Sequence, residues 1–330
     1  MTTAANAATI HTKDPLRGEV EHASGGRQTV LYTEKDQPTY MNVIPAFRCE
    51  ELGPEFGVGV HPAFIVGGVE KSEIFVGTYQ AVIRNGEALS LPGEDPTVNV
   101  DFDQARAACA AAGRGHHLAT NWDWAAVALP CAKNGAGQLR GNTNNGRSHL
   151  NHEEKGVVTM DGRTLTGSGP DTWRHDGSPF GISDLVGNVL EWCDGLKLVG
   201  GKIIMPVDNN IFLPEDQWAE IGVTFNASCD SVVLSDKVMR RGWNSSVFSR
   251  LRVKKGFKVP VTLYQALLAP GSGCDLSWKI WMDNANGLET LPFRGGGWSS
   301  GGYAGLAALN LGCERSLRYA GVGFRPAFLG

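Results

Sequence analysis

The chain has 330 residues, of which 42% are hydrophobic and 19% charged, and its formal net charge is −4. This composition indicates a globular protein with a substantial core and excludes a disordered chain. It also argues against a nucleic-acid partner, because phosphate binding needs a concentrated basic surface. Only isolated basic pairs occur, such as Arg240-Arg241 and Lys254-Lys255.

Glycine accounts for 43 residues and tryptophan for nine, which predicts a turn-rich backbone packed around large aromatic side chains. The seven cysteines are widely spaced without a C-x-x-C pair, so we expect buried free thiols. Residues 1–10 lack the cationic and apolar regions of a signal peptide, and we expect no membrane span. Display on a phage virion or a cell surface would therefore need another route.

The predicted elements begin with residues 1–43, which are polar and interrupted by Gly25-Gly26 and Pro38. We expect an N-terminal arm or small β element there, followed by a single domain over residues 44–330. Alternating side chains over residues 73–82 then predict a strand.

Two helices and a loop region follow. Residues 102–109 predict a helix with Asp101 as N-cap and Gly113 as its stop. A second helix begins with a capping box from Thr120 to Asp123 and is expected to end at Pro130. Residues 134–180 are rich in Gly, Asn, Ser and Asp, which predicts long loops. Short strands are expected at residues 202–205 and 258–261.

The last forty residues combine a regular frame with positions that follow no structural period. The frame reads R-G-G at 294–296, then W at 298, A-G at 304–305, L-N-L at 309–311, R-S at 315–316 and G-F-R at 323–325. Its scaffold residues are Gly295, Gly296, Trp298, Asn310, Arg315, Gly323, Phe324 and Arg325. The intervening positions are Ser299, Ser300, Gly302, Tyr303, Gly312, Cys313, Leu317, Arg318, Tyr319, Ala320 and Gly321. A segment that fixes shape and leaves side-chain chemistry open indicates a binding surface.

This frame resembles the variable proteins of diversity-generating retroelements. In that family, mutagenesis directed at template adenines turns Asn-type codons into codons that keep a pyrimidine in third position. The intervening positions contain no Lys, Gln, Glu, Met or Trp, which need a third-position purine. Glu314 falls outside the permitted set and is read as non-variable. The resemblance implies that the intervening positions are variable and bind a macromolecular ligand, with a protein on a cell surface as the expected target.

A second resemblance covers roughly residues 44–330. The capped helix from Thr120, the D-L-V-G-N-V-x-E-W run at 184–192, the R-G-G-G-W turn at 294–298 and the closing G-F-R occur in the order typical of formylglycine-generating enzymes. The fold it implies is α+β, irregular and loop-rich, namely the formylglycine-generating-enzyme (sulfatase-modifying factor) type of the C-type lectin fold.

The same resemblance raises a copper oxidase as an alternative function. Those enzymes carry two cysteines just after the tryptophan, and here Ser299 and Ser300 follow Trp298. A hydroxyl group is a poor Cu(I) ligand and forms no mixed disulfide, which disfavours the oxidase. His149 and His152 are spaced i, i+3 in a loop region, which favours a polar loop over a metal site. We therefore expect no catalytic residue and no required cofactor.

Two further positions carry open alternatives. By resemblance, Asn188 and Glu191 would help to bind a structural calcium ion, since hard oxygen donors suit that ion. Alternatively, Asn188 fills a left-handed turn and Glu191 makes a local hydrogen bond. Trp298 also has two interpretations: it is expected in the core beneath the binding face, beside glycines that let the backbone close over it, and the alternative is a ligand contact that acts as a hot spot.

The sequence thus predicts a non-catalytic, hypervariable ligand-binding protein, with no nucleic-acid partner and no membrane span. A structural component of a phage tail or adhesin, with a fixed rather than diversified ending, is the second alternative. The triplets E-P-N and Q-P-D of calcium-dependent sugar lectins are absent, which disfavours sugar binding by that mechanism.

Overall fold

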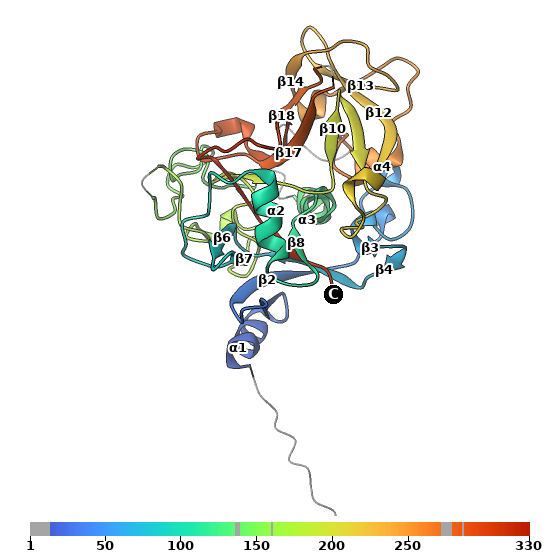
Figure 1. The fold of residues 1–330 in the computed structure, drawn as a ribbon. Coiled ribbons are helices and arrows are strands. Elements are labelled where there is room, and N and C mark those ends of the chain that lie inside the picture. The colour runs from blue at the N-terminus through green and yellow to red at the C-terminus, as the bar shows by residue number, and fades with distance from the viewer. Residues whose placement is uncertain (1–13, 136–138, 160, 272–278, 286) are drawn as a thin grey trace, which may run out of the picture.

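The computed structural model describes residues 14–135, 139–159, 161–271, 279–285 and 287–330. Helices, two main sheets and long irregular loops make up this part of the chain (Figure 1), which confirms the α+β, loop-rich prediction. The helices are α1 (Pro15–Ser24), α2 (Phe102–Ala110), α3 (Asn121–Lys133) and α4 (Val261–Gln265).

The two predicted helices form, with capping as expected. The Asp101 side chain accepts a hydrogen bond from the Gln104 amide at the start of α2, and Thr120 and Asp123 form the capping box of α3. Helix α2 ends at Ala110, before Gly113. The prediction that α3 ends at Pro130 is wrong, because the helix continues to Lys133 with the proline inside it. Proline removes one hydrogen bond of the last turn, and a terminal turn tolerates that loss better than a helix centre.

One sheet joins the beginning of the chain to its end. Its five strands, in spatial order, are β1 (Gln28–Tyr32), β2 (Pro38–Pro45), β5 (Glu73–Gly77), β20 (Pro326–Phe328) and β8 (His116–Leu118). All four strand pairs are antiparallel, and Ala327 of β20 lies opposite Val76 on one side and His117 on the other. The expected domain boundary at residue 43 falls inside β2, so the first strands are part of this sheet.

The second sheet carries the C-terminal frame. Its path is β14 (Trp243–Val247), β16 (Lys279–Asp283), β18 (Gly305–Cys313), β17 (Glu289–Gly295), β10 (Lys197–Val199), β11 (Lys202–Met205), β12 (Ala219–Ala227), β13 (Val232–Ser235) and β15 (Arg252–Val253). Off this path, β9 (Leu190–Trp192) pairs with β17 and with β19 (Val322–Phe324).

Two of the three strand predictions need correction. The strand at residues 202–205 is β11, as predicted. The strand expected at 258–261 is absent, because Pro260 is the N-cap of α4 and a proline cannot donate to a strand ladder. The run 73–82 splits into β5 and the start of β6 (Ala81–Arg84), which forms a hairpin with β7 (Glu87–Ser90). A further short hairpin joins β3 (Ile65–Val66) and β4 (Val69–Glu70).

The core lies between α3 and the second sheet. Trp122, Trp124 and Leu129 of α3 belong to one buried apolar cluster with Leu306 and Leu309 of β18. Long loops between α3 and β9 include a single short 3₁₀ helix, Asp171–Trp173, in their described part, as the Gly- and Asn-rich sequence predicts. No helix among the described residues is long and apolar enough to cross a bilayer.

Cysteines in the described residues are free thiols, and four of them are buried, as expected; these are Cys49, Cys109, Cys131 and Cys193. Cys313 is half-buried and Cys229 is exposed. The predicted thiol at Cys274 lies outside the described residues.

Candidate functional site

The frame is anchored by a buried ion pair between its last arginine and the E-W motif. Strand β19 runs parallel to β9, which places Arg325, just after β19, beside Glu191. Arg325 Nε and Nη2 donate to the Glu191 carboxylate at 2.9 and 2.6 Å, and both side chains are 1% exposed. The other guanidinium N–H groups donate to the carbonyl oxygens of Gly77 and Ser183. Two motifs separated by more than 130 residues therefore form one structural unit.

Asn188 extends this unit into a buried polar network. Its backbone is left-handed, with φ of 61°, a conformation that Asn tolerates better than most residues. The side-chain amide donates to Gln80 Oε1 at 2.9 Å and to the Thr164 carbonyl, and Asn188 Oδ1 accepts from the Thr164 amide at 2.8 Å. Gln80 in turn donates to Glu191.

These contacts match the alternative interpretation of Asn188 and Glu191, a left-handed turn and local hydrogen bonds. The carboxylate oxygens that calcium would need already accept hydrogen bonds from Arg325, so this donor set does not fit the ion without displacing a guanidinium group. The calcium site stays a prediction, and no role is derived from it.

The R-G-G turn is equally constrained. Arg294 is fully buried and donates to Asn121 Oδ1 and to the carbonyl of Leu267, and burial lowers the pKa of its guanidinium to about 10. Gly295 and Gly296 have φ of 85° and 88°. A Cβ on Gly296 would lie 2.5 Å from the Cβ of Ala304, so only glycine fits there.

At the end of β18, Arg315 belongs to an ion network that ties the frame to α2 and the Glu215 loop. It bonds Glu289, Asp103 and Glu215, and Glu215 also pairs with Arg106 and Lys197. Burial alone would raise the pKa of the Glu215 carboxyl. The hydrogen bond from Arg315 and the positive charge of Arg106 outweigh this effect and lower the pKa to about 2. Arg315 thus stabilises the base of the predicted variable loop. Gly323 and Phe324 are buried in β19.

Most of the predicted variable positions lie at the surface in two loops and at the end of one strand. The exposed members are Ser299, Gly302, Tyr303, Leu317, Arg318 and Tyr319, and the half-buried members are Ser300, Gly312, Cys313 and Ala320. Tyr303 and Tyr319 keep 55% and 52% of their surface exposed. Whether these positions vary or bind a ligand stays a prediction.

Gly321 differs from the other predicted variable positions because it is buried. A Cβ there would lie 2.6 Å from the Tyr319 ring and 3.3 Å from the Trp298 ring. A larger residue at this position would require the exposed Tyr319 ring to move, and whether Gly321 varies stays a prediction. Cys313 contacts an apolar core cluster, and burial raises the pKa of its thiol to about 11.

Tyr303 lies in a group that we name the aromatic face, made of Lys279, Trp281, Tyr303, Asn310 and Gly312. The rings of Tyr303 and Trp281 meet edge to face at 6.1 Å, and Lys279 Nζ lies 4.3 Å from the Tyr303 ring centroid. Trp281 is paired with Asn310 across β16 and β18, and Gly312 follows two residues later on the same side of the strand. Aromatic side chains with a polar rim are typical of protein interaction hot spots.

The positions from Leu317 to Gly321 contact a different part of the molecule. Arg318 bonds the Asp101 carboxylate at 2.8 Å, and the Tyr319 carbonyl accepts from the Asn99 amide. This loop therefore lies against the start of α2, whereas the loop 299–303 lies against β16.

Trp298 is half-buried at the rim and does not belong to the apolar clusters, so its predicted core position is wrong. Its ring lies against Gly162 and Gly321, with the Arg163 guanidinium 5.8 Å from the ring centroid. The backbone explains this placement: the Trp298 amide donates to the Asn188 carbonyl, and its own carbonyl accepts from the Asn145 amide. These two hydrogen bonds hold the Trp298 backbone next to Asn188 and Asn145, with its side chain half-buried.

Two residues of this region, Lys279 and Trp281, were missed in the sequence, and His149 was interpreted only as part of a polar loop. The alternation in K-I-W-M-D, with Ile280 and Met282 buried, could have placed Lys279 and Trp281 on an outer strand face. His149 Nε2 would lie 3.6 Å from a Cβ on Gly302, and its ring bonds Thr143, so it borders the loop 299–303. No sequence pattern links it to that loop.

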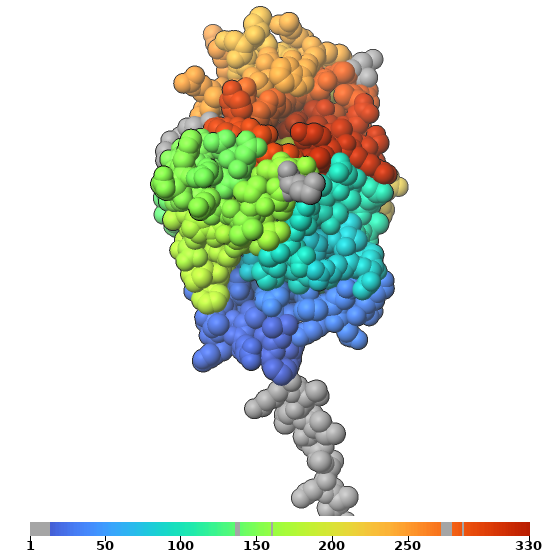
Figure 2. Space-filling model, turned by 90° about the vertical axis from the view of Figure 1, so that its left-hand side faces the viewer, coloured from blue at the N-terminus to red at the C-terminus, as the bar shows by residue number. Residues whose placement is uncertain are grey.

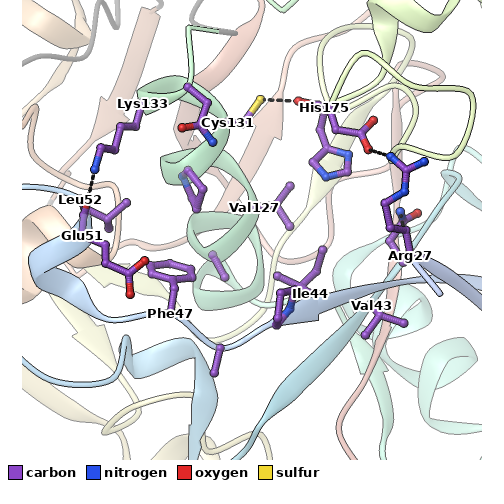
Figure 3. Close-up of a pocket in the computed structure, with 17 residues that line it drawn as sticks. Arg27, Val43, Ile44, Phe47, Glu51, Leu52, Val127, Cys131, Lys133 and His175 are labelled. Carbon is purple, nitrogen blue, oxygen red and sulfur yellow. Dashed lines mark hydrogen bonds and ion pairs between the residues drawn. The ribbon is translucent and has the colours of Figure 1, made fainter. Parts of the chain in front are cut away.

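A pocket of about 740 Å³ lies elsewhere, between β2 and α3 (Figure 3). Ile44 and Val127 give it an apolar floor, and Arg27 pairs with Asp176 at one end. The Cys131 thiol donates to the His175 carbonyl, and burial raises the pKa of that thiol to about 12. A thiol with this pKa is protonated at neutral pH, so Cys131 is a poor nucleophile.

Comparisons with known proteins find several similar solved structures, including one from Pseudomonas aeruginosa and one from Treponema denticola. No protein-family model matches the sequence, and no curated protein matches it. The chain is similar to PvdO from Pseudomonas aeruginosa, with 15% identity and a TM-score of 0.36, over 91% of this chain and 97% of that one. It is also similar to Treponema denticola variable protein 1, with 13% identity and a TM-score of 0.36, over 91% of this chain and 98% of that one. With a TM-score of 0.36 and at most 15% identity, neither similarity supports an assignment of function.

Proposed function

We propose that this chain is a non-catalytic ligand-binding protein of the retroelement-diversified type, built on the formylglycine-generating-enzyme version of the C-type lectin fold. Its variable positions are exchanged while the frame keeps the backbone in place. The expected ligand is a protein on a cell surface, reached by display on a phage virion or on another cell.

One observation carries the proposal: the frame and the positions between its pieces differ in how they are packed. Arg294, Arg325 and Gly296 are buried and bonded or sterically confined. Tyr303, Leu317 and Tyr319 expose their side chains. A surface that can be exchanged without loss of fold requires this division.

The aromatic face supports recognition as the role of this surface. Trp281 and Tyr303 offer large, rigid contact areas at low entropic cost, as in antibody paratopes, and Lys279 and Asn310 supply polar contacts beside them. The face is open rather than enclosed at Tyr303, which suits a macromolecule better than a small substrate.

Diversification is tested in two steps. A reverse transcriptase gene beside this gene, with an Asn-codon-rich copy of the 294–325 segment, is the expected genomic arrangement; its absence would leave only the fixed tail or adhesin component. The protein test is a display library randomised at Ser299, Gly302, Tyr303, Leu317, Arg318 and Tyr319. We expect folded variants that bind a chosen protein target, such as lysozyme, after selection.

The copper oxidase alternative has its own test. Neither Ser299 nor Ser300 can provide the thiolates that such an oxidase needs. We expect no Cys-peptide oxidation after incubation with Cu(I) and oxygen. Turnover of a Cys peptide under these conditions would contradict the non-catalytic proposal.

A further inference from the structure

Residues 237–243 read K-V-M-R-R-G-W. They follow Asp236, which begins the connection between β13 and β14, and they end with Trp243, the first residue of β14. Lys237, Met239, Arg240, Arg241 and Trp243 are all exposed, with Met239 at 47% and Trp243 at 62%. Strands β13 and β14 lie at the end of the molecule opposite α1 (Figure 1). In the space-filling view, this part of the chain, in orange, forms the upper end of the molecule next to the red C-terminal segment (Figure 2). The loop is therefore accessible to a large partner.

Two buried asparagines hold the backbone of this loop. Asn226 Oδ1 accepts from the Met239 amide at 2.6 Å, and Asn226 Nδ2 donates to the Lys237 carbonyl. Asn284 Oδ1 accepts from the Gly242 amide at 2.7 Å, and its amide nitrogen donates to the Arg240 carbonyl. Side chains from the core therefore satisfy the polar backbone of the loop, while the side chains of Lys237, Met239 and Trp243 are exposed.

The charge of this region is opposite to that of the whole chain. Residues 228–260 hold eight Lys and Arg and two Asp, whereas the full sequence has 34 acidic and 30 basic residues. The two acids are neutralised nearby, since Asp230 pairs with Arg252 and Asp236 with Lys254. In the described part of the chain, Lys237, Arg240 and Arg241 have no carboxylate partner. The loop thus presents three exposed cationic side chains, with an exposed Met and Trp among them. Arg241 also donates to the Asn284 carbonyl, and Arg240 donates to the Cys229 sulfur.

We propose that the loop 237–243 binds the surface of an anionic phospholipid bilayer. Free Lys and Arg side chains are attracted to anionic headgroups, and Trp and Met favour the boundary between headgroups and acyl chains. A purely hydrophilic polyanion would explain the cations and would leave the exposed Met239 and Trp243 without a contact. The combination therefore favours a lipid surface over a nucleic acid or an acidic glycan.

The test is sedimentation of the full chain with vesicles of phosphatidylglycerol and phosphatidylcholine in equal parts, beside vesicles of phosphatidylcholine alone. We expect binding to the anionic vesicles only, weakened as salt screens the cations. The double variant Lys237→Glu/Arg240→Glu should lower the partition coefficient at least about twentyfold, since each basic residue near the surface contributes about fivefold. Equal binding to both vesicle types, or no binding to either, would overturn the proposal.

Two further variants separate the contributions of charge and apolar contact. Arg114→Glu/Lys155→Glu makes the same change in net charge at exposed positions elsewhere and should leave the partition coefficient within about twofold. Met239→Gln/Trp243→Gln keeps the cations and should weaken binding about tenfold. A loss as large in the Arg114/Lys155 control as in the loop variant would contradict a specific loop. Unchanged vesicle binding in the Met239/Trp243 variant, with full competition by dextran sulfate, would identify a polyanion site instead.

Discussion

Arg325 and Arg318 lie seven residues apart, carry the same charge and each pair with a carboxylate, yet their surroundings differ completely. Arg325 and Glu191 are 1% exposed and joined by two hydrogen bonds, whereas the Arg318 side chain is 55% exposed and reaches Asp101 at the surface. A buried pair cannot lose one partner without leaving an uncompensated charge, whereas water replaces a partner at the surface. The comparison teaches that residue type alone does not separate this frame residue from this predicted variable position, whereas the burial of the two side chains does.

The largest expected effect comes from breaking the buried pair. Arg325→Met should lower the free energy of unfolding by about 3–5 kcal/mol, because Glu191 would remain buried without a cation. Arg318→Met is the matched control, with an expected loss of about 0–1 kcal/mol. Denaturant unfolding of both variants measures the difference, and similar losses would break the comparison between the two regions.

The glycines of the two regions allow a second comparison. Gly296→Ala should destabilise by about 2–4 kcal/mol, because its φ is 88° and the new Cβ would meet Ala304 at 2.5 Å. Gly302→Ala introduces a Cβ whose nearest neighbour is His149 at 3.6 Å, and should change stability by less than about 0.5 kcal/mol. Thermal unfolding of the two variants checks this order, and a stable Gly296→Ala protein would contradict the confinement of the turn.

A smaller effect is expected from acidification. The folded-state pKa of Glu215 is about 2, below its ordinary value of 4.5, so its contribution to stability is complete above pH 4.5 and is lost as the pH falls toward 2. We expect this contribution to be about 1–3 kcal/mol after allowance for partial exposure. Comparing wild type with Glu215→Gln by urea unfolding between pH 6 and pH 3 isolates it. Parallel pH profiles for the two proteins would show that the network does not hold the Arg315 loop.

The smallest effect on stability is expected at the exposed positions. Tyr303→Ala and Leu317→Ala should each change the free energy of unfolding by less than about 0.5 kcal/mol, since neither side chain belongs to the buried core. In a variant that is selected for a protein target and retains Tyr303, Tyr303→Ala should weaken binding by about 2 kcal/mol, the loss typical of an interface hot spot. Surface plasmon resonance with a folding control measures both quantities. Unaltered affinity after Tyr303→Ala would exclude the aromatic face from the interface.

Part of the fold that holds the frame could be predicted from the sequence, because helix capping depends on residues that are close together in the chain. Capping residues correctly predicted the starts of α2 and α3. The pairing of Arg325 with Glu191 was beyond local rules, since it depends on β19 lying parallel to β9. Trp298 was misplaced for a related reason: hydrogen bonds to Asn188 and Asn145, far away in sequence, decide where its backbone lies.

The aromatic face shows the same limit. Trp281 contacts Tyr303 only because β16 and β18 run side by side in a mixed sheet, and no pattern in either strand specifies that neighbour. Sequence patterns alone indicate an isolated basic pair at Arg240-Arg241, because the sequence does not show which residues hold this loop in place. Asn226 of β12 and Asn284, just after β16, hydrogen-bond the Lys237 and Arg240 carbonyls and so hold both residues in one loop.

The most direct test of the division between frame and variable positions is the thermal stability of two libraries of equal size. One is randomised at Ser299, Gly302, Tyr303, Leu317, Arg318 and Tyr319, and the other at Gly295, Gly296, Arg294, Phe324, Gly323 and Arg325. We expect most members of the first library to unfold within a few degrees of wild type and most of the second to be unfolded at 37 °C. Overlapping distributions of unfolding temperature in the two libraries would contradict the account.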